Sequence, residues 1–224
     1  MRIRLDHVSH RYGESEEAAA VQVLDDVSLE IASGDFAVLR GASGGGKSTL
    51  LNLIGAVDRP TSGSIRIGDV ETSALSEREL TLLRRTQLGF VFQFFNLIPT
   101  LNAYENIAFP LSLAKVPRAQ IETRVSEVLQ RIGLEHRAKH YPNALSGGEM
   151  QRVAIGRAIV HRPSLILADE PTGNLDSVSG TAILELIRDI HRNQRPTVVM
   201  ATHSDRAASF GDYVIEVADG RVKR

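Results

Sequence analysis

The sequence contains no cysteine and no tryptophan, and aromatic residues make up only 5% of its 224 residues. The absence of cysteine excludes disulfide bonds and thiolate metal sites, and it agrees with a reducing cytoplasm. No apolar stretch approaches the roughly 20 residues that a membrane-spanning helix needs, so a role at a membrane would require another chain to span it. The formal net charge of −1 gives no reason to expect nucleic acid or an acidic membrane surface as the main partner.

The remaining composition is that of an ordinary globular protein, with 42% apolar and 24% charged residues. A chain of this length can bury one sizeable core, so we expect a single domain over residues 1–224. Apolar runs of strand length alternate with segments of helical spacing, which indicates an α/β fold with a mainly parallel sheet. The acidic, alanine-rich segment at residues 14–20 interrupts this pattern and is expected to be an exposed loop.

Two parts of the chain depart from the alternation of strands and helices. Residues 2–5 and 23–31 alternate apolar and polar positions, as strands of an antiparallel layer with one buried face do. Later in the chain, apolar residues recur at helical spacing over a long stretch, which predicts a helical subdomain at about residues 93–160. The core then comprises about residues 1–92 and 161–224.

Residues 41–48 fit the phosphate-binding pattern G-x-x-x-x-G-K-[ST], with an apolar run before them and a helical pattern after them. Glycines let backbone N–H groups curve around an anion where side chains would obstruct them. Lys47 can reach the β- and γ-phosphates, and the Ser48 hydroxyl can bind Mg²⁺. The helix that follows would direct its positive N-terminus at the phosphates. The residues of this segment predicted to contact ATP are Gly41, Ser43, Gly44, Gly45, Gly46, Lys47, Ser48 and Thr49.

Polar residues follow three further apolar runs, namely Gln93, the pair Asp169 and Glu170, and His203. Because ligands bind outside the carboxyl ends of parallel strands, we expect these residues to meet the phosphate loop at one sheet edge. Asp169 is placed to hold Mg²⁺, directly or through water, and Glu170 could polarise an attacking water. His203 could hydrogen-bond the γ-phosphate or orient that water. The pattern therefore predicts a site that hydrolyses nucleotides.

A second Ser-Gly-Gly turn, formed by Ser146, Gly147 and Gly148, precedes a predicted helix at residues 151–160. One chain cannot easily apply two phosphate-binding turns from different subdomains to a single nucleotide. Two chains arranged head to tail could do so, each contributing its Ser-Gly-Gly turn to the γ-phosphate bound by the other. This arrangement predicts a dimer that holds ATP between its subunits.

These motifs together resemble the nucleotide-binding subunit of an ATP-binding cassette (ABC) transporter, over essentially the whole chain. Residues 145–152 resemble the signature motif of that family, which is its most diagnostic element. Residues 41–48 and 165–170 match its two nucleotide motifs in the expected order. No residue of these motifs departs from the family pattern, so the resemblance implies an active Mg²⁺-dependent ATPase.

The resemblance assigns roles that spacing alone leaves open. Gln93 falls at the glutamine loop, which implies catalytic sensing of Mg²⁺ and of a membrane partner. Asp176 lies in a segment that resembles the loop crossing the dimer interface, and His203 resembles the switch histidine. Tyr12 fits the aromatic residue that stacks on adenine, although an exposed aromatic residue considered alone is more often a packing residue.

The fold implied by the resemblance is a P-loop NTPase core with an N-terminal antiparallel β layer and a helical subdomain carrying the signature motif. The implied cofactors are ATP and Mg²⁺. The implied partners are a second copy of the chain and an integral membrane permease subunit, without nucleic acid. The protein would then act peripherally at the cytoplasmic face of the cell membrane.

Within the family, residues 95–101 and 168–176 resemble a subgroup of lipoprotein-releasing, macrolide-export and cell-division ATPases. The predicted function is to drive export, release or force transmission through a separate transmembrane partner. A cell-wall regulatory complex that transports nothing would share every catalytic residue, so that alternative stays open. A soluble ABC-type ATPase of DNA repair or translation is disfavoured, because the sequence has no coiled-coil arms, zinc module or second cassette.

Each motif also has a less specific interpretation. Residues 41–48 could be a flexible Gly/Ser turn with a lysine placed by chance, and Asp169 with Glu170 a surface acidic pair. The Ser-Gly-Gly turn could be an ordinary helix N-cap. A metabolite kinase sharing the phosphate loop is the least favoured alternative, because nothing in it requires residues 145–152.

Overall fold

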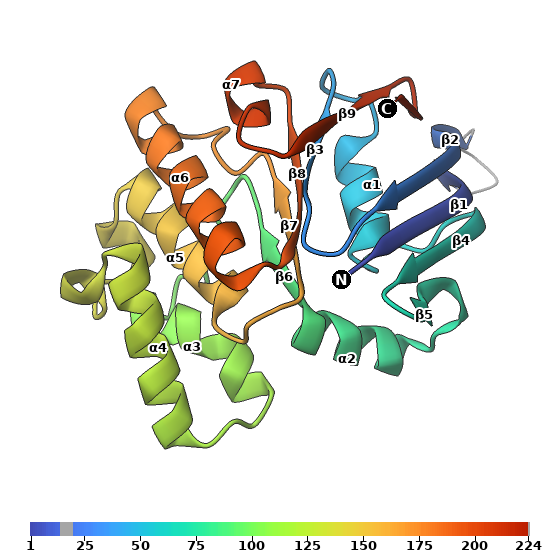
Figure 1. Ribbon diagram of the computed structural model, residues 1–224. Helices are drawn as coiled ribbons and strands as arrows, with labels where there is room; N and C mark the ends of the chain where they lie inside the picture. Colours follow the sequence, from blue (N-terminus) through green and yellow to red (C-terminus); the bar gives the residue numbers. More distant parts are fainter. Residues whose placement is uncertain (14–19, 224) are drawn as a thin grey trace.

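The computed structural model describes residues 1–13 and 20–223, so the predicted acidic loop lies outside the described residues except for Ala20. Two sheets form the centre of the molecule, and helices pack between and around them (Figure 1). The smaller sheet is antiparallel, with the strand order β2-β1-β4-β5. Its strands are β1 (Ile3–Tyr12), β2 (Val21–Ile31), β4 (Ser62–Ile67) and β5 (Val70–Glu71). The predicted antiparallel layer is thus confirmed and extended by β4 and β5.

The larger sheet has the strand order β10-β9-β3-β8-β7-β6. All of its neighbouring strands pair in parallel except β9 and β10, which form an antiparallel hairpin. Its strands are β3 (Phe36–Arg40), β6 (Leu88–Val91), β7 (Leu165–Asp169), β8 (Thr197–Thr202), β9 (Tyr213–Ala218) and β10 (Arg221–Lys223). The central strand β8 is buried along its whole length, as expected for a strand covered on both faces.

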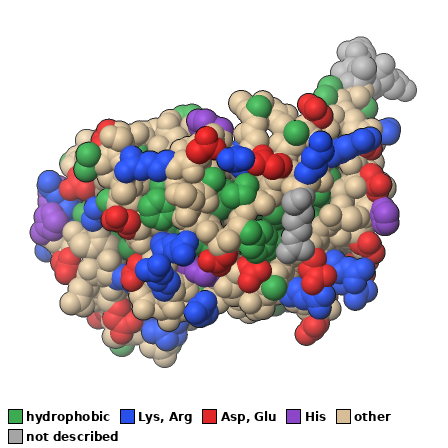
Figure 2. Space-filling view, turned by 45° about the horizontal axis from the view of Figure 1, so that its top comes forward, with side chains coloured by type: hydrophobic (Ala, Val, Ile, Leu, Met, Phe, Trp, Pro, Cys, Tyr) green, Lys and Arg blue, Asp and Glu red, His purple; other side chains and the backbone are tan. Residues whose placement is uncertain are grey.

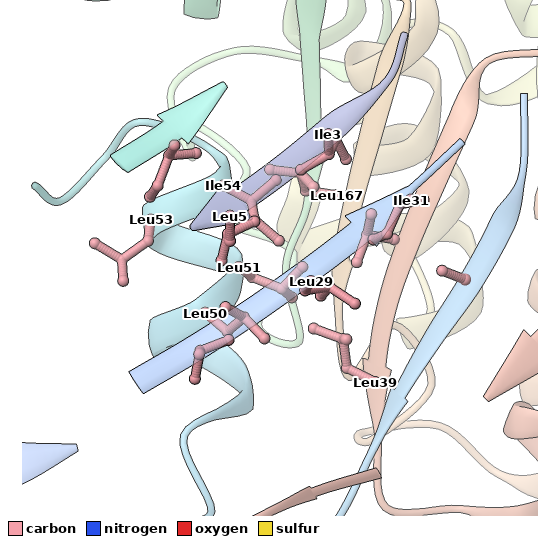
Figure 3. Close-up of a cluster of buried hydrophobic side chains, with 14 of the residues drawn as sticks. Ile3, Leu5, Leu29, Ile31, Leu39, Leu50, Leu51, Leu53, Ile54 and Leu167 are labelled. Atoms are coloured by element: carbon pink, nitrogen blue, oxygen red, sulfur yellow. The ribbon is translucent and has the colours of Figure 1, made fainter. Parts of the chain in front are cut away.

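The helix α1 (Lys47–Ile54) lies between the two sheets (Figure 1). Its apolar side chains pack with residues of β1, β2, β3 and β7 in one buried cluster (Figure 3). Leu50, Leu53 and Ile54 are completely buried there. Because α1 begins at the phosphate loop, this packing fixes the position of the loop relative to both sheets.

Further helices cover the opposite face of the larger sheet. Both α5 (Gly147–Ile159) and α6 (Ser177–Gln194) pack against that face, and α3 (Ala103–Leu113) and α4 (Arg118–Ile132) pack outside α5. The remaining helical segments are α2 (Glu77–Gln87), α7 (Asp205–Ala208), η1 (Thr72–Ala74), η2 (Glu135–Arg137) and η3 (Pro142–Ala144). In the described part of the chain, no helix is both long and apolar enough to cross a membrane.

Helix boundaries follow the local capping chemistry. Ser76 and Glu79 form a capping box at the start of α2, and Gly133 ends α4 at a φ of 70°. The helix predicted at residues 151–160 begins four residues earlier, at Gly147, because Ser146 serves as its N-cap. Side chains of α5 belong both to the cluster beneath the sheet and to the cluster with α3 and α4. The division of the domain at about residues 93 and 160 therefore stays a prediction.

Candidate active site

A cavity of about 700 Å³ lies at the edge of the larger sheet where β3, β7 and β8 end. Figure 2 shows the molecule turned so that this edge comes forward, with apolar, acidic and basic side chains interspersed over it. The cavity is lined by Val23, Ala42, Ser43, Gly44, Gly46, Lys47, Ser48, Thr49, Gln93, Glu170 and His203. The structure thus brings the phosphate loop together with three of the residues predicted from strand ends, whereas their chemical roles stay predictions.

The phosphate loop depends on close backbone approaches. A Cβ atom on Gly41 would lie 2.0 Å from the carbonyl oxygen of Val217 in β9, so no larger residue fits there. Gly46, the N-cap of α1, has a φ of 102°, a conformation that strongly favours glycine. The Lys47 ammonium donates to the carbonyls of Gly41 and Ala42, each at 2.9 Å, and its side chain is buried. This places a cation where the loop would receive phosphate.

The Glu170 carboxylate is held by two residues at the end of β8. Thr202 Oγ1 donates to Oε2 at 3.2 Å, and His203 Nδ1 lies 2.8 Å from Oε1. Because a carboxylate only accepts hydrogen bonds, Nδ1 carries the proton in this contact. Glu170 itself has a φ of 44°, and its N–H donates to the Ala201 carbonyl at 3.0 Å. Such a strained conformation often marks a functional residue, and here it fixes the carboxylate beside the cavity.

Asp169 lies one residue earlier, and its Oδ1 atom is buried without a hydrogen-bond partner among the residues described. Burial raises the pKa of the Asp169 carboxyl, and the neighbouring Glu170 raises it further. A hydrogen bond from Ser48 and the charge of Lys47 oppose that shift. An unpartnered carboxylate oxygen next to a hydroxyl is the type of oxygen donor set that Mg²⁺ takes, together with phosphates of a substrate. The residues present therefore fit a magnesium ion.

Gln93 follows β6 and lines the cavity. Its side-chain Nε2 lies 3.5 Å from Asn174 Oδ1, and Asn174 Nδ2 donates to the Gln93 carbonyl at 3.0 Å. This pair joins the Gln93 loop to the segment that follows Glu170. Asn174 belongs to the segment that resembles the interface loop, and its contact with Gln93 was not predicted from the sequence.

The predicted Ser-Gly-Gly turn does not line this cavity. Ser146 Oγ accepts from the Glu149 N–H at 3.3 Å, and Glu149 Oε2 accepts from the Ser146 N–H at 2.8 Å. The hydrogen bond from the Ser146 N–H to the Glu149 carboxylate lowers the pKa of Glu149. A Cβ atom on Gly148 would lie 3.3 Å from Ser179 Oγ, so the turn sits beside α6. Within one chain the turn is thus the N-cap of α5 and lies outside the cavity lining.

Asp176 and Tyr12 also lie outside the cavity lining. Asp176 is the N-cap of α6 and accepts from the N–H groups of Val178 and Ser179. Hydrogen bonds from Ser179 and Val178 lower the pKa of Asp176. Tyr12 is the last residue of β1, and its side chain is exposed. Two glycines of the predicted phosphate site, Gly41 and Gly45, are also absent from the cavity lining, and a Cβ atom on either would meet the Val217 carbonyl of β9.

Residues 24–173 match the profile that describes the ABC transporter family. The chain belongs to this family. This ABC protein is 44% identical to the ATP-binding protein YtrE of Bacillus subtilis over 99% of its own length and 96% of YtrE. It is also 44% identical to the lipoprotein-releasing system ATP-binding protein LolD of Bordetella avium, over 98% and 95% of the two chains.

Among solved structures, the ABC protein resembles the dimeric ATP-binding cassette MJ0796 in a post-hydrolysis state bound to ADP and Pi. The TM-score is 0.90 at 42% sequence identity, with 99% of this chain and 97% of that chain covered. The predicted fold class is confirmed by this similarity. The prediction of an ATPase is confirmed as well. The chain belongs to the ABC transporter family, and its relative MJ0796 is seen in a post-hydrolysis state with ADP and Pi bound.

Gln151 is a functional candidate that sequence analysis missed in this ABC ATPase. It is completely buried in α5, and its Nε2 donates to the carbonyls of Phe92 at 3.3 Å and Pro171 at 2.7 Å. These carbonyls lie beside Gln93 and Glu170, respectively. The sequence signal for Gln151 was its spacing, because it lies four positions before Ile155 and therefore on the same, buried side of the helix. Gln151 therefore ties α5 to the segments that carry Gln93 and Glu170.

Arg157, also in α5, is a second functional candidate that was not predicted from the sequence. Its guanidinium donates to the carbonyls of Phe95, at 2.9 Å, and Asn96. Both of these residues have positive φ angles, 60° and 49°, so the loop after Gln93 is strained and Arg157 holds it. Burial lowers the pKa of Arg157. No sequence pattern announces a hydrogen bond to carbonyls so far away in the chain.

Replacing Asp169 with asparagine is expected to stabilise the ATPase in the absence of metal and nucleotide, and to abolish ATP hydrolysis if Asp169 holds Mg²⁺ as predicted. The folded pKa of Asp169 lies above the unfolded value of 3.8, so stability is lost as pH rises from 3.8 through the folded pKa. The amide of asparagine carries no charge and removes that loss. Because solvent reaches part of the group, we expect a rise in Tm of only about 2–4 °C, or ~1 kcal/mol.

Thermal unfolding at pH 7 without nucleotide or metal measures this effect. The pKa of Asp176 is shifted in the opposite direction, so the matched variant Asp176→Ala should lower Tm. The gain from Asp169→Asn should shrink as the pH falls toward 4. A lower Tm for Asp169→Asn at pH 7 would contradict the prediction.

Proposed function

We propose that this ABC protein is the ATP-hydrolysing subunit of a membrane complex and drives export, release or force transmission through a separate transmembrane partner. The observation that carries this proposal is the Glu170–His203 pair beside the phosphate loop, which supports coupled hydrolysis rather than nucleotide binding alone. The name of LolD, a lipoprotein-releasing system protein, supports a role of this type.

In the proposed reaction, Glu170 accepts a proton from the attacking water, and the water oxygen bonds to the γ-phosphorus. The bond between that phosphorus and the β–γ bridging oxygen breaks, and ADP leaves with phosphate. Lys47 neutralises charge on the β- and γ-phosphates, while the backbone N–H groups of the loop bind the same oxygens. His203 is held by Glu170 through Nδ1, and its Nε2 donates to the γ-phosphate when the ring carries a proton on both nitrogens.

Ser48, Asp169 and Gln93 would hold Mg²⁺ in this site. When bound, the ion neutralises charge that develops on the β- and γ-phosphate oxygens. The burial of Asp169 keeps its unpartnered oxygen away from competing waters. Tyr12 completes the site by stacking on the adenine ring.

Two copies of the chain close over two ATP molecules in the proposed dimer. Ser146, Gly147 and Gly148 of one copy contact the γ-phosphate bound by the other copy, and Asp176 lies at the same interface. The dimeric arrangement of MJ0796 supports this assembly. Val178, beside Asp176, has 78% of its surface exposed in the single chain, which is consistent with a face that a second copy covers.

A groove of about 440 Å³ supports the docking of the membrane partner. Its apolar walls include Phe92, Phe109 and Leu113, and its described charged residues are arginines, among them Arg85 and Arg157. It lies between α2 and β6 on one side and α3 and α5 on the other, along the proposed boundary of the helical subdomain. A cytoplasmic segment with apolar and acidic residues would fit this groove and hold the ATPase at the membrane.

The experiment that tests this proposal is affinity purification of the tagged chain from gently solubilised native membranes, followed by identification of integral partners. Arg85→Glu should remove the partner, whereas Arg78→Glu, an exposed arginine of α2 outside the groove, should retain it. A partner with few spans and a large external domain would support release or force transmission. One with six or more spans around a cavity would support conventional transport. Full ATPase activity in the soluble fraction without any integral partner would overturn the proposal.

A further inference from the structure

The Tyr12 side chain is anchored to the far end of the helix that carries the phosphate loop. Its hydroxyl donates to Asp58 Oδ2 at 3.0 Å, and Asn52 Nδ2 donates to the same oxygen at 3.3 Å. Asn52 belongs to α1, and Asp58 lies in the turn that follows it. Asp58 therefore joins Tyr12, the last residue of β1, to α1, although Tyr12 and Asp58 are 46 residues apart in the chain.

The hydroxyl also interacts with the beginning of α1. Burial raises the pKa of the Tyr12 phenol and so does Asp58, whereas hydrogen bonds with the side chains of Thr49 and Asn52 lower it. Thr49 follows directly after Lys47 and Ser48, the residues that face the phosphate site. The same helix thus positions both the phosphate loop and the tyrosine ring.

A second side chain fixes the ring from the sheet. The His10 ring lies against the Tyr12 ring, with centroids 4.5 Å apart and an angle of 86° between the planes. His10 is buried, and neither ring nitrogen has a hydrogen-bond partner in the described segments. It therefore acts here as an aromatic packing residue. Tyr12 nevertheless keeps 43% of its surface exposed, which leaves ring surface for a ligand.

We propose that Asp58 is a positioning residue for the nucleotide base. It holds the Tyr12 hydroxyl, while His10 packs on the ring, so that the exposed ring surface stands at a fixed place relative to the phosphate loop. This inference rests on the proposed function, in which Tyr12 stacks on adenine. Because the Tyr12 hydroxyl already donates its proton to Asp58, Tyr12 contributes stacking but donates no hydrogen bond to the edge of the base.

The base and the phosphates of ATP should respond differently to loss of the Asp58 contact. Loss of the anchor should weaken the binding of ATP, which carries a base, and leave inorganic tripolyphosphate unaffected, because that anion needs only the phosphate loop. An aromatic contact of this kind is worth a factor of about 3–10 in affinity when its geometry is correct. The chemical step does not involve the base, so kcat should stay within about a factor of two of wild type.

Steady-state ATPase assays on the full chain, with tripolyphosphate as a competing inhibitor, provide the test. Asp58→Ala and Tyr12→Phe should each raise KM for ATP about 3–10-fold, with the Ki of tripolyphosphate unchanged. Asp58→Asn keeps an acceptor for the hydroxyl and should restore a KM near the wild-type value. Tyr12→Phe removes only one oxygen atom from a partly exposed side chain, so it is the variant least able to disturb folding. Asp69→Asn, an exposed aspartate elsewhere on the surface, is the matched control.

The outcomes distinguish this inference from the proposal on which it rests. If Tyr12→Ala raises KM while Asp58→Ala and Tyr12→Phe do not, stacking stands and the positioning role of Asp58 is wrong. If Tyr12→Ala leaves KM unchanged, the stacking role itself fails. An equal rise in the Ki of tripolyphosphate for Asp58→Ala would also overturn the inference, since Asp58 would then act on the phosphate loop.

Discussion

Replacing Glu170 with glutamine is expected to slow ATP hydrolysis by about 10²–10⁴-fold, the usual contribution of a general base. The amide keeps the size of the side chain and can accept the hydrogen bond from Thr202, but it cannot take a proton from water. Its loss should therefore appear in kcat, while ATP binding is retained. Because hydrolysis would no longer separate the subunits, the variant should accumulate as an ATP-bound dimer.

Single-turnover hydrolysis and gel filtration with Mg²⁺ and ATP measure the two parts of this prediction. Glu185→Gln, an exposed glutamate of α6, serves as the control and should behave like wild type. Thr202→Val should give a smaller loss of rate than Glu170→Gln, because it removes only one of the contacts that hold the carboxylate. A Glu170→Gln variant that keeps more than about a tenth of the wild-type rate would show that another group is the base.

A Lys47→Ala variant and a Ser146→Asp variant are each expected to lose ATPase activity, and an equimolar mixture of the two should regain part of it. In the proposed dimer, each site combines Lys47 of one copy with Ser146 of the other. A mixed dimer therefore has one site with both changes and one site with neither. If the sites act independently, the mixture should reach about one quarter of the wild-type rate per chain.

The choice of aspartate at Ser146 protects the fold. Aspartate is as good an N-cap as serine, so α5 should keep its capping hydrogen bond, while the added charge repels the γ-phosphate. Loss of a group that stabilises the transition state typically costs about 10²-fold or more in rate. Equal thermal stability of the variant and the wild type would confirm that only the site is affected. Failure of the mixture to regain activity would mean that Ser146 does not act across the dimer.

The sequence could predict those parts of the site that depend on local chemistry. The phosphate loop needs glycine at Gly41 and Gly46 because of backbone approach and a positive φ, and such requirements leave a readable pattern. Gln93, Glu170 and His203 were predictable for a related reason. Parallel strands end at a common edge, so a polar residue directly after an apolar run is expected to lie at that edge.

Contacts between distant segments could not be predicted in this way. Nothing in the sequence indicates that Thr202 donates to Glu170 or that Gln151 donates to the carbonyls of Phe92 and Pro171. The same is true of Arg157, which holds the loop after Gln93, and of Asp58, which anchors Tyr12. Each contact joins residues that lie 32 to 62 positions apart, or 20 in the case of Gln151 and Pro171. Such pairs arise only when strands and helices pack, because the packing fixes which side chains meet.

The sequence by itself determined the α/β fold class, the phosphate loop, the residues at the strand ends and the Ser-Gly-Gly turn, since all of these follow from local periodicity, glycine geometry and the common edge of parallel strands. The tertiary structure alone decided where these groups point. It left Ser146 outside the cavity of its own chain, fixed the Glu170 carboxylate between Thr202 and His203, and anchored Tyr12 to Asp58 after α1. The orientation of these side chains depends on packing between segments that are remote in the chain, so it cannot be predicted from the local sequence.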